Sequence, residues 1–155
     1  MNISIKLTQN PKKKPDEDKL SFGRQFTDHM FLMDYKEDKG WHDARIVPYG
    51  PLTLDPSTNV LHYGQGVFEG LKAYKTEDNR VLLFRPDENA KRLKSSCERL
   101  CIPPIDEIDV VEGIIKLVKT DIDWVPSSKG TSLYIRPFII STDPFLGVHP
   151  SHSYL

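Results

Sequence analysis

Tyr134 and Arg136, in the stretch "LYIRPF", have the chemistry needed to hold an anionic group. They are two positions apart in a segment of strong β propensity, so on a strand they share one face while Leu133 and Ile135 share the other. A guanidinium can bind a carboxylate or a phosphate through two parallel N–H donors, which favours a ligand-binding role. A solvated face of a sheet is the alternative interpretation of the same pair.

A second stretch, "LHYGQGVFEGLKAYK" (residues 61–75), combines glycines with large aromatic side chains. Glycine weakens helices and strands, so its presence here favours a backbone that turns tightly or approaches another group closely. The glycines and aromatics concerned are Gly64, Gly66, Gly70, Tyr63, Phe68 and Tyr74. The stretch is not a dinucleotide-binding fingerprint, because Glu69 occupies the third glycine position and no strand–turn–helix pattern surrounds it. We predict that its aromatic residues close around a small ligand.

The elements that would position these residues follow from local patterns. Strands are expected over 30–35 and near 44–50, and a hairpin over 71–84 turns at Glu77–Asn79. A helix is expected over 86–100, because Pro86 suits its first turn and an apolar stripe follows; the stripe contains Ala90, Leu93, Cys97 and Leu100. A second helix from Asp106 should bury Ile108, Val111, Ile115 and Val118. A long strand over 131–142 and another beginning at 153 complete an α+β two-layer sandwich, a mostly antiparallel sheet with helices on one face.

Composition limits the class of protein. The 155 residues contain 21 Lys and Arg against 22 Asp and Glu, so the balanced charge disfavours a nucleic-acid binder. No apolar run reaches the roughly 20 residues of a membrane span, and no signal-peptide pattern opens the chain. Cys97 and Cys101 would share a helical face, and without a His or Cys cluster they are interpreted as core thiols rather than metal ligands. We therefore expect a cytoplasmic domain that binds no metal, nucleic acid or membrane.

Three segments are expected along the chain. Residues 1–20 are rich in Pro and in charges of both signs, which is typical of a flexible, solvated segment. Residues 21–142 form the small α+β domain. Residues 143–155 are predicted to begin a linker, with a large C-terminal domain absent.

Five motifs, in order and with compatible spacing from Phe22 onward, give the sequence a resemblance to a known family. They are "FTDHMFLMDY", "LHYGQGVFEGLKAY", "LLFRPDENAKRL", "ERLCIPP" and "LYIRPFIISTDPFLGV". Together they resemble the branched-chain amino acid aminotransferases, the fold type IV pyridoxal-phosphate enzymes. The resemblance covers only the smaller, N-terminal domain of that family and the start of the linker.

The resemblance implies roles for individual residues. Arg92 would contact the phosphate of pyridoxal 5'-phosphate. Leu146 and Val148 would belong to a loop that reaches the active site of the neighbouring subunit in a homodimer. The substrate pocket would be formed by Phe22, Tyr63, Phe68, Gly70, Tyr134 and Arg136.

The same pocket has to hold two different side chains. Phe22 and Phe68 can bury a branched alkyl group, which contributes about 1.5–3 kcal/mol. Arg136 can pair with the γ-carboxylate of glutamate, and we expect the hydroxyls of Tyr63 and Tyr134 to accept hydrogen bonds from it when leucine is bound. The resemblance thus implies transfer of an amino group from leucine, isoleucine or valine to 2-oxoglutarate, in branched-chain amino-acid biosynthesis.

One part of the family's machinery is missing from the chain. The lysine that forms the Schiff base with the cofactor lies in the family's large C-terminal domain, so no catalytic residue is assigned here and the chain alone is expected to be inactive. Two alternatives stay open at this point. One is another fold type IV enzyme, a D-amino acid transaminase or an aminodeoxychorismate lyase, and the other is a non-catalytic module that binds small ligands or anions.

Overall fold

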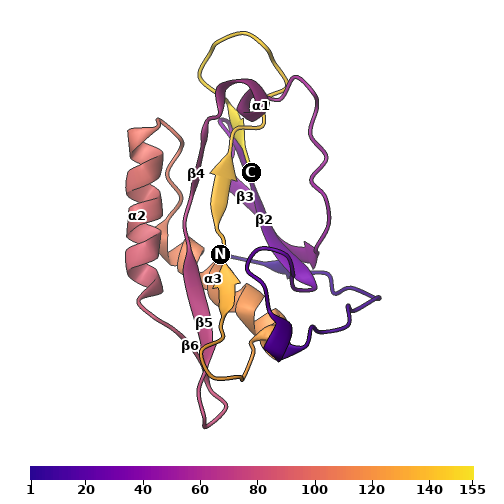
Figure 1. Cartoon of the computed structure of the whole chain (residues 1–155). Helices are drawn as coiled ribbons and strands as arrows, with labels where there is room; N and C mark the ends of the chain where they lie inside the picture. Colours follow the sequence, from indigo (N-terminus) through magenta and orange to yellow (C-terminus); the bar gives the residue numbers. More distant parts are fainter.

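A computed structural model describes all 155 residues and has short strands in three sheets beside two long helices (Figure 1). The strands are β1 (Ser4–Ile5), β2 (His29–Lys36), β3 (Gly40–Pro48), β4 (Gly66–Phe68), β5 (Leu71–Lys75), β6 (Val81–Leu83), β7 (Leu133–Ile135), β8 (Phe138–Ile140) and β9 (Ser153–Tyr154). The helices are α1 (Asn59–Tyr63), α2 (Pro86–Arg99) and α3 (Glu107–Thr120), with short 3-10 helices η1 (Glu17–Lys19) and η2 (Ile122–Trp124). The predicted α+β class is confirmed.

The strands pair mainly antiparallel, but in three small sheets rather than in the single sheet expected. The largest has the order β1-β3-β2-β9, in which only the β1–β3 pair is parallel. The other two are the pair β4-β8 and the sheet β6-β5-β7. Both predicted hairpins are present, as β2–β3 and β5–β6. The helices α2 and α3 contact each other, and they cover the strands through α2 on β4 and α3 on β2.

The strand predicted over 131–142 is interrupted, and this correction has a simple cause. Pro137 has no N–H to donate to a ladder, so strand pairing cannot continue through it. The segment before it forms β7, which pairs with β5, and the segment after it forms β8, which pairs with β4. The carbonyl of Pro137 is still used, because it accepts a hydrogen bond from the N–H of Glu69 at 2.8 Å. The interruption therefore joins two sheets.

The helix α2 begins as predicted, with Pro86 in its first turn and acidic residues after it. It ends one residue before the expected limit, because Cys101 reverses the chain direction with a φ of 54°. As a result Cys97 is fully buried, whereas Cys101 is exposed. The prediction of two core thiols on one face is therefore wrong for Cys101, which lies beyond the helix.

The helix α3 is capped by Asp106, whose side chain accepts from the N–H of Ile108 at 2.7 Å. The predicted apolar stripe is wrong for Ile108 and Ile115, which are 76% and 37% exposed, whereas Val118 is buried and Val111 packs against the core as expected. The residues that α3 buries are Val110, Gly113, Ile114 and Val118. The sequence of this helix has apolar residues on more than one side, so periodicity alone did not identify the buried side.

None of the helices combines the length and hydrophobicity needed to cross a bilayer.

The first twenty residues, predicted to be flexible, make specific contacts with the rest of the chain. The strand β1 pairs with β3, and the N-terminal amine lies 2.8 Å from the carboxylate of Glu112 on α3. Glu17 binds two backbone N–H groups of the segment between η2 and β7. Composition did not reveal these contacts, because each partner is more than 40 residues away in the sequence. The limits proposed for the segments 1–20, 21–142 and 143–155 stay predictions.

Candidate functional site

Four of the predicted site residues form one aromatic and cationic cluster, which we call the Arg136 cluster: Phe22, Phe68, Tyr134 and Arg136. The guanidinium carbon of Arg136 lies 4.6 Å from the ring centroid of Phe68 and 5.3 Å from that of Tyr134. Its Nη2 donates a 2.9 Å hydrogen bond to the hydroxyl of Tyr134. The ring of Phe22 meets that of Tyr134 edge to face, with centroids 4.9 Å apart. Residues from three distant parts of the sequence thus meet at one place.

Arg136 is exposed and has no carboxylate within ion-pairing distance. Cation–π contacts and one hydrogen bond to a neutral acceptor stabilise it, and both leave most of its five N–H donors free. An unpaired guanidinium beside two aromatic rings can receive a carboxylate or phosphate, and it can also stay in place when an apolar group lies against the rings. The arrangement is therefore suited to ligands of both kinds.

Gly70 makes room for this cluster. A β-carbon at this position would lie 3.0 Å from Cζ of Tyr134 and far inside van der Waals contact with its hydroxyl oxygen. The Tyr134 hydroxyl that accepts from Arg136 therefore occupies the space that any other residue at position 70 would fill. This explains one of the glycines that the sequence places among aromatics. Gly64 has a different role, because it ends α1 with a φ of 66°.

Gly70→Ala is expected to displace the Tyr134 ring and break its hydrogen bond with Arg136, at a cost of about 1–3 kcal/mol in the free energy of unfolding. Chemical denaturation measures the cost, and the NMR signals of the Tyr134 ring report the displacement. Gly50→Ala is the matched control, since nothing lies within 4 Å of a β-carbon there. If Gly70→Ala were as harmless as the control, the proposed steric role would be wrong.

No hydrogen bond, aromatic pair or cation–π contact joins Tyr63, Leu146 or Val148 to the Arg136 cluster. The hydroxyl of Tyr63 donates to the carbonyl of Leu146 and accepts no hydrogen bond from Arg136, whose side chain donates to Tyr134 instead. The expectation is therefore wrong for Tyr63 and correct for Tyr134. Leu146 is 58% exposed and Val148 is 87% exposed. The hydrogen bond to Tyr63 attaches this loop, which carries both aliphatic residues, at the backbone of Leu146.

Arg92 is bound on one edge by Glu69. Its Nε and Nη2 donate to the two carboxylate oxygens of Glu69 at 2.5 and 2.7 Å. The Arg92 guanidinium holds the pKa of the Glu69 carboxyl below its usual value, with help from hydrogen bonds donated by Asn89 and by the N–H of Gly70. The Glu69 side chain is only 4% exposed, whereas that of Arg92 is 68% exposed. Glu69 therefore orients an arginine whose remaining donors face outward.

The two arginines lie on opposite sides of the strand that follows Gly66. Successive side chains of an extended chain alternate, so Phe68 points to Arg136 while Glu69 points to α2 and Arg92. Our sequence reasoning missed Glu69 and Asn89 as supporting residues. A signal for them exists, because Asn89 and Arg92 are three apart on a helix and can reach the same partner.

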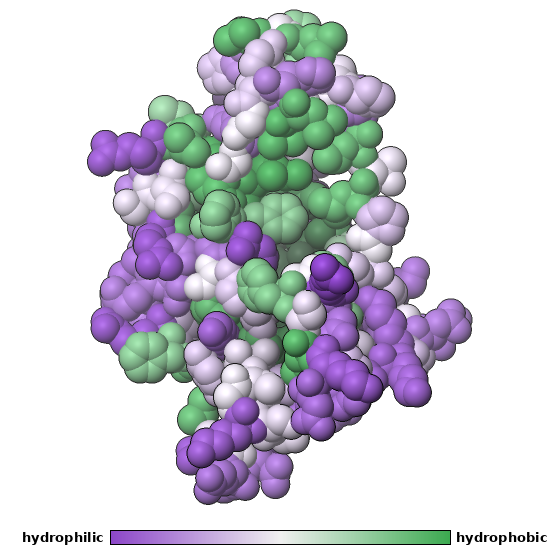
Figure 2. Space-filling view, in the orientation of Figure 1, coloured by the Kyte–Doolittle hydropathy of each residue, from purple (hydrophilic) through white to green (hydrophobic).

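Hydrophobic surface gathers around the candidate site. Figure 2 shows it concentrated in the upper half of the face in view, where β4 and the C-terminal loop lie in Figure 1. The exposed hydrophobic residues of these segments and their neighbours are Phe22, Tyr63, Phe68, Phe138, Phe145, Leu146 and Val148. A surface this apolar is typical of an interface or a ligand-binding region.

Known proteins similar to this chain form a consistent group, although no protein-family model matches it. The chain is 63% identical over 152 residues to branched-chain-amino-acid aminotransferase 2 of Bacillus subtilis, covering 98% of this chain and 42% of that protein. It is 64% identical over 143 residues to branched-chain-amino-acid transaminase 1 of the same organism, covering 92% of this chain and 40% of that protein. The chain thus spans about two fifths of the length of the curated relatives it matches.

Solved structures agree with these relatives. The T.th. branched-chain amino acid aminotransferase with pyridoxamine 5'-phosphate superposes with a TM-score of 0.58 at 26% identity, over 81% of this chain and 38% of that one. The chain is a relative of the branched-chain-amino-acid aminotransferases and corresponds to about two fifths of such a protein.

Proposed function

We propose that this chain is the small domain of a branched-chain L-amino-acid aminotransferase. The complete enzyme transfers the amino group of leucine, isoleucine or valine to 2-oxoglutarate and yields a branched 2-oxo acid and glutamate. The proposal rests on the 63% identity that extends over 98% of the chain to a relative named for this activity. The limits 21–142 for the small domain and 143–155 for the start of the linker belong to the same proposal.

The Arg136 cluster supplies the walls of the substrate pocket. With leucine bound, the rings of Phe22 and Phe68 bury its branched side chain, and Arg136 stays against Phe68 and Tyr134 as it does in the free chain. With glutamate bound, the free N–H donors of Arg136 pair with the γ-carboxylate. Tyr134 orients the guanidinium in both cases through its hydroxyl. One pocket can therefore accept both members of the amino-group exchange.

Arg92 is suited to hold the phosphate of pyridoxal 5'-phosphate. Two of its five N–H donors are occupied by Glu69, and the others remain on the exposed edge of the guanidinium, where two phosphate oxygens can bind. The T.th. aminotransferase has been solved with pyridoxamine 5'-phosphate and with N-(5'-phosphopyridoxyl)-L-glutamate. The cofactor, when bound, supplies the electron sink of the reaction, while the residues of this chain bind and orient.

A chimera tests the proposed function. It consists of this chain followed by the part of the Bacillus subtilis relative beyond the matched region, and it is assayed with cofactor for leucine-dependent conversion of 2-oxoglutarate to glutamate. We expect activity from the chimera and only the free-cofactor background from the 155-residue chain alone. A preference for D-alanine over L-leucine would contradict the proposal in favour of a D-amino acid transaminase. Tight binding of leucine by the isolated chain in calorimetry would favour a binding module.

Arg92→Ala is expected to weaken cofactor binding by the chimera about 10- to 100-fold, because charge-assisted hydrogen bonds contribute about 1.5–3 kcal/mol each. The ratio of leucine to glutamate turnover should change little, because Arg92 and Arg136 lie on opposite sides of the strand. Titration of the dialysed chimera with pyridoxal 5'-phosphate measures the affinity. Arg99→Ala, on the same helix and without an acidic partner, is the control. An unchanged affinity would make Arg92 an ordinary surface residue.

We further propose that the complete enzyme is a cytoplasmic homodimer in which the loop bearing Leu146 and Val148 reaches the partner's site. The high exposure of both side chains and the hydrogen bond that attaches the backbone of Leu146 to Tyr63 support this role. Both cysteines are free thiols, which fits a reducing compartment.

Light scattering of the chimera should give the mass of two chains, and Val148→Asp should lower the measured mass toward that of one chain.

A further inference from the structure

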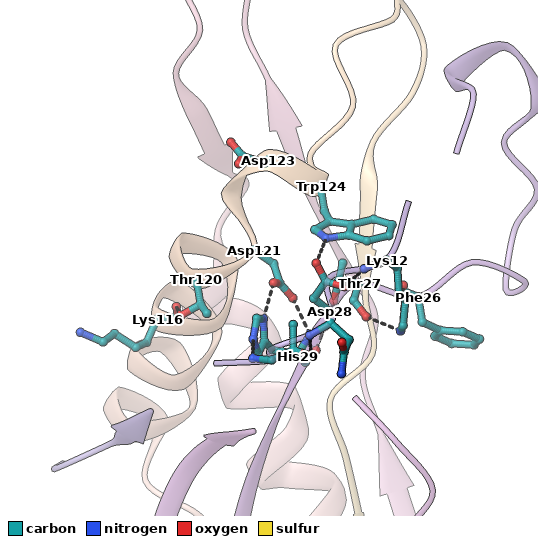
Figure 3. A network of polar contacts seen from close by, with 12 residues as sticks. Lys12, Phe26, Thr27, Asp28, His29, Lys116, Thr120, Asp121, Asp123 and Trp124 are labelled. Atoms are coloured by element: carbon teal, nitrogen blue, oxygen red, sulfur yellow. Dashed lines mark hydrogen bonds and ion pairs between the residues drawn. The ribbon is translucent and has the colours of Figure 1, made fainter. Parts of the chain in front are cut away.

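Residues 8–22, which we call the N-terminal strap, are attached to the domain at several points. The N–H of Thr8 donates to Nε2 of His29 at 2.9 Å. The N–H of Lys12 donates to Oδ1 of Asp28 at 2.8 Å, and the Lys12 amine donates to the carbonyl of Thr27 at 2.8 Å. Figure 3 shows Lys12 meeting the start of β2 beside His29. The first half of the strap is thus fixed along one end of the largest sheet.

Glu17 provides the attachment that precedes Phe22 most closely in the sequence. Its carboxylate accepts from the N–H of Ser127 at 3.0 Å and from the N–H of Ser128 at 2.7 Å, and the hydroxyl of Ser127 lies at 3.3 Å. Two adjacent backbone donors on one carboxylate make a strong, directional anchor. The anchor is 110 residues away in the sequence, on the segment that leads directly into β7.

Phe22 has no comparable anchor of its own. Its side chain is 75% exposed, and its one aromatic contact is the edge-to-face packing on Tyr134. Burial therefore does not hold the ring in the Arg136 cluster. The backbone that carries Phe22 must be held elsewhere.

The Glu17–Ser128 and Phe22–Tyr134 contacts align the strap with the segment that leads into β7. Glu17 and Phe22 are five residues apart, and their partners Ser128 and Tyr134 are six residues apart. A segment of five residues spans at most about 17 Å, so fixing Glu17 on the loop before β7 restricts the Phe22 ring to the neighbourhood of Tyr134. Released at Glu17, the strap would still be held by the Lys14–Asp123 ion pair, eight residues before Phe22, and by the stacking of Phe26 on Tyr49, four residues after it. Glu17 is therefore the nearest anchor on the N-terminal side of Phe22.

We propose that Glu17 is a positioning residue, which holds Phe22 as a wall of the substrate pocket by anchoring the N-terminal strap to Ser127 and Ser128. The inference rests on the proposed function for the pocket itself. Glu17 touches no substrate, and it selects substrates only through the place it gives to Phe22. Its loss should therefore affect branched alkyl side chains more than glutamate, whose γ-carboxylate is bound by Arg136.

The anchor is charged under ordinary conditions. Hydrogen bonds from Ser128 and Ser127 lower the pKa of Glu17 from 4.5 to about 2. Because the folded-state pKa is the lower one, the stabilisation is complete above about pH 4.5 and disappears as the pH falls toward 2. The strap is thus held at neutral pH without titrating.

Hydrogen exchange and NMR on the 155-residue chain test the anchor independently of activity. With Glu17→Ala, the amides of Ser127 and Ser128 should exchange about tenfold faster, as expected from the loss of a charge-assisted hydrogen bond, and the cross-peaks between the Phe22 and Tyr134 rings should vanish. The amide of Thr8 should keep its protection. Asp18→Ala is the matched control, because this neighbouring acid accepts no side-chain hydrogen bond and forms no ion pair. Ring cross-peaks that persist in Glu17→Ala would overturn the proposal.

A double-mutant cycle in the chimera tests the consequence for the pocket. Phe22→Ala and Glu17→Ala should each raise KM for leucine about fivefold with kcat within about twofold, and the double variant should be no worse than Phe22→Ala alone, because coupled residues are not additive. Additive losses, or equal losses for leucine and glutamate, would assign Glu17 a general structural role and overturn the proposal. An inactive chimera would contradict the proposed function, while the NMR experiment still decides whether Glu17 positions Phe22.

Discussion

Arg136→Ala in the chimera should lower kcat/KM for glutamate about 30-fold or more, while kcat/KM for leucine changes less than about threefold. Removing one partner of a hydrogen-bonded charge pair costs about 2–5 kcal/mol, and here only glutamate brings the second charge. The structure supports this asymmetry because Arg136 has no acidic partner in the chain and rests on Phe68 and Tyr134. Its removal therefore leaves no buried charge without a partner.

The measurement is a pair of half-reactions followed in single turnovers, one with leucine and one with glutamate. Arg136→Lys should lose part of the glutamate rate, since an ammonium keeps the charge but lacks the planar fork. Arg99→Ala again controls for the loss of an exposed positive charge. Losses of equal size for the two substrates would show that Arg136 supports the fold of the cluster instead of recognising the γ-carboxylate.

Asp121→Asn should be among the most destabilising isosteric substitutions in the chain. His29 accepts from Thr8 at Nε2, so Nδ1 carries the hydrogen and donates to Oδ1 of Asp121 at 2.6 Å (Figure 3). The N–H of His29 donates to Oδ2 of the same carboxylate at 3.0 Å. Both carboxylate oxygens are thus required as acceptors, and Asp121 and His29 are only 4% and 7% exposed.

An asparagine offers one acceptor and turns its NH₂ group toward a second donor. Leaving a buried donor unpaired costs about 1–3 kcal/mol, and Asp121→Ala, which removes both acceptors, should cost about 2–5 kcal/mol. Thermal unfolding should show a drop of about 2–4 °C for each kcal/mol. Asp123→Asn is the control, because this carboxylate is 81% exposed and lies 3.7 Å from Lys14. A melting temperature for Asp121→Asn within a degree of the control would disprove the tautomer assignment.

Local signals in the sequence predicted the elements that depend on neighbouring residues. The hairpins β2–β3 and β5–β6 follow from alternation and turn residues, and α2 follows from Pro86 and its apolar stripe. Pro137 was also a signal for the interruption, because proline cannot donate a hydrogen bond within a ladder. The strong β propensity of the residues on either side nevertheless led to the prediction of one continuous strand. The exposure of Ile108 could not be predicted, because it depends on which side of α3 meets β2 and α2.

In the candidate site, too, local contacts could be predicted from the sequence and long-range contacts could not. Tyr134 and Arg136 could be placed on one face from their spacing, and the structure joins them by a hydrogen bond. The pairing of Arg92 with Glu69 and the anchoring of Glu17 on Ser127 and Ser128 join residues 23 and 110 or more positions apart, which no local pattern encodes. The resemblance to a family indicated which residues belong to the site, but only the fold shows which neighbouring residues fix their side chains in place.

The division of residues 133–155 among all three sheets has a consequence for biosynthesis. β7, β8 and β9 pair with β5, β4 and β2, so each sheet receives a strand from this late segment. β4 pairs with β8 alone, and β8 begins 72 residues later in the sequence. At a translation rate of about 5–20 residues per second, β8 is therefore synthesised roughly 4–14 s after β4. During that interval the backbone of β4, including Val67, has no neighbouring strand to pair with. The nascent chain should therefore hold its two hairpins early and be a client of ribosome-associated chaperones until the late segment emerges.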